Sequence, residues 1–382
     1  MWITSSLKAV KTPTNIALGN FDGVHLGHQR VMAQILSEPE KEPKAQQQAP
    51  IEPTAHAALS ASSVAALHSG VIALNHSYFS NLAKPDDADT NALGLPIGPS
   101  VDSTNGPHQA TTTPCKTAVT FSPHPQEYFS GISRPLLTPI AEKTWQLAQL
   151  GIQQLVMLPF DRALSALSPE AFVEQILIKG LQAKRISIGS DFRFGKGRCG
   201  NADGLQAIAA HYGVPVVQVP LKYEGGDRIS SSRIRTALQI GHLTEATQLL
   251  GRPYTLTGQV VKGQQLGRTL GFPTANLQLP VEKYLPRTGV YSVKVYGAEA
   301  SPLAGPLKGV MNIGNRPTVE GQALSVEVHV LDWAGDLYGQ LLTVSLEGFI
   351  RPEKKFDSLA ELKAQISQDC RAAMLTLADL KA

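Results

Sequence analysis

The chain has 382 residues, of which 42% are hydrophobic and 17% charged; this is ordinary for a globular protein and long enough for two domains. Its 34 basic and 31 acidic residues leave a net charge of +3, too small to indicate binding to nucleic acid or to an acidic membrane surface. Three widely spaced cysteines, no apolar run of membrane length and no signal-peptide pattern predict a protein of the reducing cytoplasm without a disulfide framework or zinc site. The oligomeric state cannot be read from the sequence.

A glycine-rich stretch from Gly19 to His28 follows an apolar run at residues 16–18 and precedes an amphipathic segment that begins at Gln29. We expect a strand, a turn and a helix in that order, an arrangement that binds ligands at the carboxyl end of a parallel sheet. Glycines allow the backbone to approach a ligand closely, and the start of a helix attracts an anion. The candidate phosphate-binding residues of this stretch are Gly19, Phe21 and Gly27.

Two histidines, His25 and His28, lie three residues apart at the expected helix start. Both can point toward one phosphate and donate hydrogen bonds as negative charge develops on it, so they are candidate catalytic residues. A His-x-x-His pair can also be incidental or bind a metal ion. The strand-turn-helix setting favours a phosphate.

The segment from about residue 38 to 113 differs from its surroundings, because prolines interrupt it repeatedly and alanine, serine, threonine and asparagine dominate it. This composition offers little apolar surface for a folded core. We therefore predict a disordered insertion, from which no function can be read.

Strands and helices alternate after the insertion. Strands are predicted at residues 118–121, 155–158, 185–188 and 214–219, and helices from Thr138 to Gly151, from Ser168 to Gly180 and at 202–211. This alternation indicates a mostly parallel, doubly wound sheet. Pro123 and Pro125 rule out continuation of the first of these strands as a central strand, so a loop at the sheet edge is expected there, containing Pro123 and His124.

Two further loops in this half contain residues suited to a nucleotide. Residues 190–198 combine three cations with two aromatic rings, which suits a polyphosphate or a flat ring, although a solvated basic loop is equally compatible. Residues 229–235 lie where a helix should begin, so hydroxyl and free N–H groups can face an anion; the alternative is a helix cap with surface arginines. The candidates in the two loops are Asp191, Phe192, Ser230, Ser231, Ser232, Arg233 and Arg235.

The pattern changes after Gly251-Arg252-Pro253, where β-rich runs follow one another without helices between them. The expected strands are at residues 255–261, 289–296, 307–313, 324–331 and 341–349, and a closing helix is expected at about 358–380. This predicts a small antiparallel β-barrel with a C-terminal helix. We therefore expect one domain at residues 1–251 and a second at 252–382.

A glycine-rich loop, residues 263–276, and a later strand contain the candidate chemistry of the second half. Thr274 and Asn276 offer hard oxygen ligands for Mg²⁺. Glu327 lies on the strand face opposite Val326 and Val328, where a solvent-facing carboxylate is the simple alternative to a functional one. The loop is not a Walker motif; its candidate nucleotide-binding residues are Gly263, Gly267, Arg268 and Gly271.

Taken together, the N-terminal motifs resemble the H-x-G-H signature of the nucleotidyltransferase superfamily. In their order along the chain they resemble the Rossmann-like FMN adenylyltransferase module of bacterial bifunctional riboflavin kinase/FAD synthetases. The resemblance implies that His25, His28 and the Ser-Ser-Ser-Arg segment ending at Arg233 bind ATP and stabilise its α-phosphate. It further implies that the Asp191 loop and the Ser-Pro-His-Pro segment surround the flavin and the nucleotide. The long insertion departs from the family pattern.

The second half resembles the riboflavin kinase of the same family. The resemblance implies that Thr274 and Asn276 coordinate the Mg²⁺ of ATP and that Glu327 takes the proton from the 5′-hydroxyl of riboflavin. Asn315 and Arg316 match a further family loop. The implied activity is phosphorylation of riboflavin to FMN, followed by adenylylation of FMN to FAD with release of pyrophosphate. Two alternatives remain: a riboflavin kinase with an impaired second module, and a flavin-binding protein without catalysis.

Overall fold

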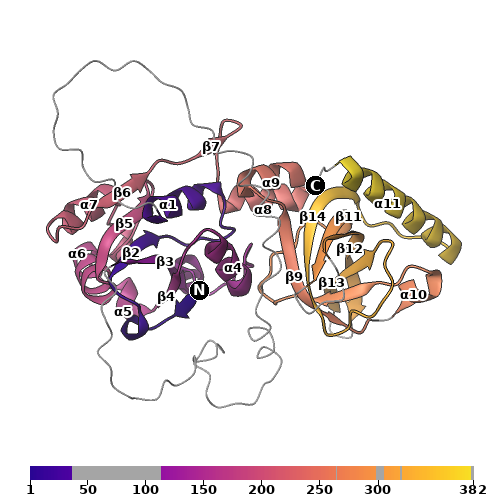
Figure 1. Ribbon diagram of the computed structural model, residues 1–382, viewed down its shortest axis with the longest axis horizontal. Coiled ribbons are helices and arrows are strands. Elements are labelled where there is room, and N and C mark those ends of the chain that lie inside the picture. Colours follow the sequence, from indigo (N-terminus) through magenta and orange to yellow (C-terminus); the bar gives the residue numbers. More distant parts are fainter. Residues whose placement is uncertain (37–112, 264, 298–304, 319–320, 380–382) are drawn as a thin grey trace, which may run out of the picture.

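The computed structural model describes residues 1–36, 113–263, 265–297, 305–318 and 321–379. The insertion predicted at about residues 38–113 lies outside them, apart from Thr113. The described chain forms two parts that lie next to each other, with two helices between them (Figure 1). We call the α/β part before residue 230 the sheet region, the helices α8 (Ser231–Ile240) and α9 (Leu243–Leu250) the linking helices, and the part from Arg252 onward the barrel region.

The sheet is parallel throughout, and its strands within the described residues run in the order β1-β4-β3-β2-β5-β6. The strands are β1 (Trp2–Thr4), β2 (Thr14–Leu18), β3 (Cys115–Ser122), β4 (Gln154–Pro159), β5 (Ala183–Gly189) and β6 (Val216–Val219). From β2 the chain proceeds to β3 and β4 on one side and later to β5 and β6 on the other, so β2 lies at the topological switch point, where such sheets bind ligands. The predicted parallel sheet is confirmed.

Helices surround this sheet, and the structure contains the helices predicted within residues 138–151, 168–180 and 202–211. They are α1 (Leu26–Leu36), α3 (Pro125–Ser130), α4 (Ile140–Gln149), α5 (Arg162–Ser165), α6 (Pro169–Ala171), a π-helix (Phe172–Gly180) and α7 (Ala202–Ala210), with 3-10 turns at Leu7–Ala9 and Lys196–Arg198. Ser168 caps α6 by accepting from Ala171 N at 3.2 Å. A short hairpin, β7 (Tyr223–Glu224) and β8 (Asp227–Arg228), precedes the linking helices.

The strand β3 ends before the two prolines, as predicted, but a helix follows it after two residues in place of the expected loop at the sheet edge. β3 is an inner strand, paired with β2 and β4, and its pairing ends at Ser122 before the prolines can interrupt it. Pro125 then occupies the first turn of α3, where a missing N–H costs nothing. Similarly, Thr138 does not cap α4: its hydroxyl accepts instead from Gly23 N at 2.9 Å.

The C-terminal strands close into an antiparallel barrel in the order β10-β13-β12-β11-β14-β9. They are β9 (Tyr254–Val261), β10 (Ala275–Gln278), β11 (Gly289–Gly297), β12 (Leu307–Thr318), β13 (Gly321–Val330) and β14 (Leu341–Arg351); helix α10 (Leu266–Leu270) precedes β10 and α11 (Leu359–Asp379) follows β14. The predicted barrel and closing helix are confirmed. The short strand β10 was not predicted.

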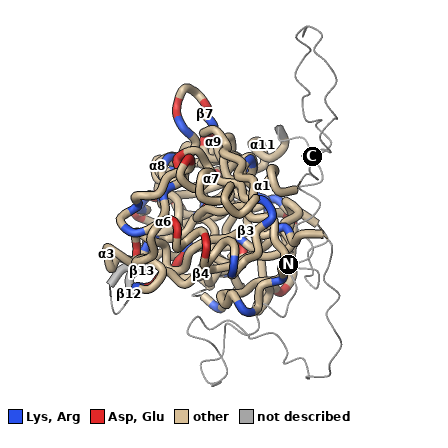
Figure 2. Tube along the Cα trace, turned by 90° about the vertical axis from the view of Figure 1, so that its left-hand side faces the viewer, with Lys and Arg blue, Asp and Glu red and all other residues tan. Residues whose placement is uncertain are grey.

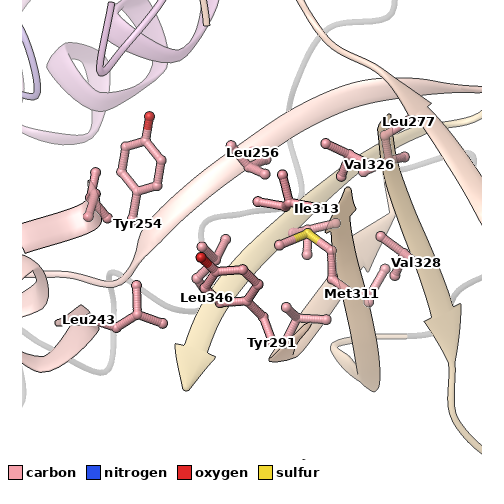
Figure 3. Packing of buried hydrophobic residues seen from close by; sticks show 14 of the residues in the cluster. Leu243, Tyr254, Leu256, Leu277, Tyr291, Met311, Ile313, Val326, Val328 and Leu346 are labelled. Carbon is pink, nitrogen blue, oxygen red and sulfur yellow. The ribbon is translucent and has the colours of Figure 1, made fainter. Parts of the chain in front are cut away.

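One hydrophobic cluster joins the barrel interior to the linking helices, α8 (Ser231–Ile240) and α9 (Leu243–Leu250). In Figure 3, Leu243 and Tyr254 lie at one end of this cluster, while Leu277, Val326 and Val328 lie at the other. The helices that precede residue 251 thus share a core with the strands that follow it. The domain boundary at 251/252 stays a prediction.

Lys and Arg positions are interspersed with Asp and Glu positions along the chain trace in Figure 2, in keeping with the small net charge. Among the described helices, none is long and apolar enough to span a membrane. The cysteines Cys115, Cys199 and Cys370, all in the described part of the chain, are free.

Candidate functional site

The loops that follow β2, β3, β5 and β6 enclose a cavity of about 1040 Å³ at the carboxyl edge of the sheet. Because these strands are parallel and flank the switch point, segments distant in sequence meet there. The predicted site residues that line the cavity are Gly19, Phe21, His25, Gly27, His28, His124, Asp191, Phe192, Ser230, Ser231, Ser232 and Arg235. Pro123 and Arg233 are not among the lining residues.

The two histidine rings are stacked, with their centroids 3.6 Å apart. The backbone N–H of His28 donates to His25 Nδ1 at 3.3 Å, so the neutral His25 ring carries its proton on Nε2. Burial lowers the pKa of His25 to about 4 and holds the pKa of His28 well below its ordinary value. Both rings are therefore neutral at pH 7, and each can donate one hydrogen bond without carrying a charge.

The predicted glycines and Phe21 support the histidines rather than simply leaving space. A Cβ on Gly27 would lie 3.1 Å from the His25 ring, so glycine lets that ring pack against the first turn of α1. Phe21 is only 1% exposed, and its ring meets His28 edge-on at 5.4 Å. A Cβ on Gly19 would lie 3.0 Å from the Phe21 ring. Among the described residues, no group of three or more His, Cys, Asp or Glu side chains is arranged to hold a metal ion.

Arg235 is held at the cavity by a buried ion pair with Asp22. Its Nη2 also donates to Pro135 O at 3.0 Å, whereas its Nε and Nη1 are buried without a hydrogen-bond partner. His28 Nδ1 is likewise buried and unpartnered. Buried donors of this kind are normally satisfied, and a bound anion would satisfy those of the guanidinium with charge-assisted hydrogen bonds.

Two serines at the start of α8, Ser230 and Ser231, make different contacts. Ser230 accepts from Arg233 N at 3.3 Å and so caps the helix, whereas Ser231 Oγ donates to Asp22 O at 2.8 Å and ties α8 to the glycine-rich turn. Arg233 faces the β7–β8 hairpin: its Nε lies 2.7 Å from Glu245 Oε1, and its Nη1 donates to the carbonyl oxygens of Glu224 and Asp227.

The other side of the cavity is aromatic and more exposed. Asp191 and Arg228 form an ion pair at 2.6 Å, with both side chains nearly half exposed. Phe192 stacks on Phe194. His124 accepts from Gln126 N at 3.0 Å, and burial lowers the pKa of its ring. The phenylalanines Phe121, Phe129, Phe160 and Phe172 also line this side, which gives it an apolar surface suited to a flat ring.

A second group of predicted residues meets on, or directly before, adjacent strands of the barrel. Thr274 Oγ1 lies 3.3 Å from Glu327 Oε2, and Asn276 on β10 is directly opposite Glu327 on β13. A Cβ on Gly263 would lie within 2.5 Å of the Asn276 side-chain amide, so glycine is needed where that loop passes over the strand. His329, on the same face of β13 as Glu327, contacts Pro273 O through Nδ1 at 2.8 Å.

The remaining candidates of the barrel region lie in and just after helix α10 and near the end of β12. Gly267 and Arg268 are in α10, and Gly271 ends that helix at φ 87°. A Cβ on Gly267 would lie 2.3 Å from Phe272 O. Asn315 donates through its N and Nδ2 to the carboxylate of Glu353, at 3.1 and 3.2 Å. The backbone of Arg316 pairs with Ala323 at the end of β12.

Several residues of these sites were not found from the sequence. Asp22, Thr138, Arg134 and Arg228 lie at the cavity or hold the residues that line it, and Glu353 holds Asn315. Asp22 lies inside the glycine-rich motif, so its position was a usable signal. The pairing of Thr138 with Gly23 joins residues 115 apart in sequence, and no local pattern indicates it.

Comparison with known proteins assigns a family to this pair of sites. The sequence model of the riboflavin kinase family matches residues 250–377, and that of the FAD synthetase family matches residues 7–51 and 107–233. The bifunctional riboflavin kinase/FMN adenylyltransferase of Escherichia coli K12 is 44% identical over 250 residues, which cover 65% of this chain and 78% of the relative. The chain belongs to the bifunctional riboflavin kinase/FMN adenylyltransferase family.

A second relative supports the family, and a solved structure supports the fold. The family member of Listeria monocytogenes is 38% identical over 274 residues, covering 69% of this chain and 84% of its own. A solved structure titled as a macrolide-efflux protein from Streptococcus pneumoniae matches with a TM-score of 0.68 and 25% identity, over 97% of this chain and 98% of its own. The fold class and the family predicted from the sequence are thus confirmed.

Proposed function

We propose that the chain makes FAD from riboflavin in two steps, each at one of the two sites. The kinase site on the barrel transfers the γ-phosphate of ATP to riboflavin, and the cavity of the sheet region joins the resulting FMN to the AMP part of a second ATP. We assign the second step to residues 1–251 and the first to residues 252–382. The observation that carries the proposal is the set of unpartnered buried polar atoms, His28 Nδ1 and the donors Arg235 Nε and Nη1, in residues that line a cavity large enough for a nucleotide.

In the adenylyl transfer, a phosphate oxygen of FMN attacks the α-phosphorus of ATP while the bond to the pyrophosphate oxygen breaks. The attacking oxygen is already anionic, so no general base is needed. The protein must hold the reactants in line and stabilise the charge on the α-phosphate. His25 Nε2–H, His28 and Arg235 are the donors that we assign to this charge, in place of Arg233, which faces the hairpin. The aromatic side of the cavity receives the flavin ring.

In the kinase step, the 5′-hydroxyl of riboflavin attacks the γ-phosphorus of ATP and ADP leaves. Glu327 takes the hydroxyl proton, since a carboxylate next to the attacking oxygen is the group able to accept it. The glycines of the loop at residues 263–271 let the backbone approach the nucleotide phosphates.

The donor set beside Glu327 fits Mg²⁺. Thr274 Oγ1 and the Asn276 side-chain oxygen are hard ligands from residues two apart in sequence, the first just before β10 and the second on it. Thr274 contacts the Glu327 carboxylate, and Asn276 is paired with Glu327 across the neighbouring strand, which supports placing the ion beside this carboxylate. Thr274 and Asn276 would hold the ion together with the nucleotide. When bound, Mg²⁺ would neutralise phosphate charge and orient the nucleotide.

Two single variants of the full-length protein test the assignment. His28→Ala should lower FAD formation about 100- to 1000-fold, the usual cost of losing one transition-state donor, while FMN accumulates from riboflavin. Glu327→Gln should abolish FMN formation, yet still convert supplied FMN to FAD. Products are separated by chromatography after incubation with ATP and Mg²⁺, and His211→Ala, which replaces an exposed histidine outside both sites, serves as the control. Loss of both activities in either variant would contradict the assignment.

A further inference from the structure

The turn that leads into His25 is strained. Phe21, Gly23 and Val24 all have positive φ, at 50°, 85° and 43°. Glycine adopts this conformation freely, but a β-branched residue such as Val24 does so only at a cost. Strained residues persist where surrounding groups fix them, and His25 follows Val24 directly. The position of the catalytic histidine therefore depends on whatever holds the carbonyl groups of this turn.

Arg252 holds two of these carbonyl groups at once. Its Nη2 donates to Gly23 O at 2.9 Å and its Nη1 to Val24 O at 3.3 Å. Gln29 Nε2 adds a second donor to Val24 O at 3.0 Å. The side chains of Gln29 and Arg252 also donate to Leu250 O, and these bonds hold the end of α9 next to the glycine-rich turn. The planar guanidinium thus bridges successive carbonyls of the strained turn, a geometry that a single ammonium group cannot reproduce.

The segment around Arg252 is packed tightly against the start of α1. Gly251 has a φ of 75°, and a Cβ there would lie 2.5 Å from Leu26 Cδ2, so glycine is strongly favoured where the chain crosses this helix start. Burial lowers the pKa of Arg252 to about 10, which leaves it charged at neutral pH. Arg252 does not line the cavity. Its influence on a bound nucleotide must therefore pass through the turn.

We propose that Arg252 is a positioning residue for FMN adenylyl transfer, which fixes the carbonyl groups of Gly23 and Val24 and thereby places His25 and His28 against the α-phosphate of ATP. The inference rests on the proposed adenylyltransferase function. It means that a residue within the segment matched by the riboflavin kinase family organises the site of the other reaction. The kinase site itself does not require Arg252.

The test uses full-length Arg252→Met and Arg252→Lys, with FMN and ATP supplied. In both variants kcat for FAD formation should fall by about tenfold or more, because displacement of a catalytic group by about 1 Å can cost on the order of 100-fold. KM for FMN should change by less than about twofold, since Arg252 does not contribute to ground-state binding. The rate of FMN formation from riboflavin should stay at the wild-type value.

Arg351→Lys is the matched control, because Arg351 is a partly buried arginine paired with Asp369 at helix α11, away from the turn. It should leave kcat for FAD formation unchanged even if it lowers thermal stability. Wild-type kcat in Arg252→Lys would overturn the proposal, because charge alone would then suffice, and so would a loss expressed only in KM or a parallel loss of kinase activity. If the wild-type protein makes no FAD, the proposed function itself fails. If the wild-type protein makes FAD and the Arg252 variants make it at the same rate, the function stands and this inference fails.

Discussion

A buried ion pair joins the barrel region to the sheet region, and its removal should destabilise the protein strongly. Lys283 Nζ lies 2.5 Å from Glu142 Oε2, with the two side chains 1% and 9% exposed. It also donates to Leu137 O at 2.8 Å. Lys283→Met would leave the Glu142 carboxylate buried without its partner, which typically costs about 3–5 kcal/mol. For a protein of this size, that corresponds to a fall in Tm of about 10 °C.

The dependence of this loss on pH follows from the state of Glu142. Burial raises the pKa of that carboxyl, and Lys283 opposes the rise. Without Lys283, the folded-state pKa of Glu142 should lie further above its unfolded value. The destabilisation is then fully present above this raised pKa, and it diminishes as the pH falls through that pKa and the carboxyl takes up a proton.

Thermal scans of three variants test this reasoning. Glu174→Gln breaks the Lys179–Glu174 pair, which has a similar distance of 2.6 Å but is 68% and 40% exposed, and it should leave Tm unchanged within error. The double variant Lys283→Met/Glu142→Leu should recover most of the stability lost in Lys283→Met, because no charge is then buried. If Lys283→Met behaves like the surface control, or if the double variant is less stable than the single one, the reasoning is refuted.

Three further predictions concern the cavity. Arg235→Lys should lower kcat for FAD formation by at least about tenfold, because one ammonium cannot replace the guanidinium donors. Arg233→Lys should have a much smaller effect, and equal losses of the two variants in steady-state assays would contradict the assignment. Gly27→Ala should impair FAD formation but not FMN formation, since the added Cβ would lie 3.1 Å from the His25 ring; an unchanged FAD rate would show that the ring need not stay there. The pKa of His25 is lowered from 6.5 to about 4 in the folded state, so the unfolded state binds more protons between these two pH values. The contribution of this residue to stability should therefore fall toward acid pH by at most about 1.4 kcal/mol per pH unit. Urea midpoints measured across that range should fall less steeply in His25→Gln than in the wild type, and parallel slopes would refute this.

Local patterns predicted most of the fold. Alternating strand and helix signals gave the parallel sheet, and the β-rich runs after Pro253 gave the barrel, because hydrophobic periodicity and glycine or proline boundaries depend on neighbouring residues. The failures have a common origin. β1 and β10 have only three and four residues and are formed through pairing with distant strands, and the position of β3 within the sheet depends on topology rather than on its own sequence.

The site was predictable where its residues belong to one motif and not where they come together only in the folded chain. His25, Gly27 and His28 are such a motif, and the structure places them together at the cavity. Arg233 and Arg235 lie two residues apart, so both were candidates, but the helical turn points only Arg235 toward Asp22. Arg252 was visible merely as a boundary residue. Its contact with the glycine-rich turn joins residues more than two hundred positions apart, and no sequence period could reveal it.

The central claim is that one chain contains two chemically independent sites that act in sequence. The most direct test mixes two inactive variants, His28→Ala and Glu327→Gln, in one reaction with riboflavin, ATP and Mg²⁺. Alone, the first should stop at FMN and the second should leave riboflavin unchanged. Together they should form FAD, because FMN released by the first variant reaches the intact adenylyltransferase site of the second. If each variant behaves as expected on its own and the mixture still yields no FAD, the claim of two independent sites is contradicted.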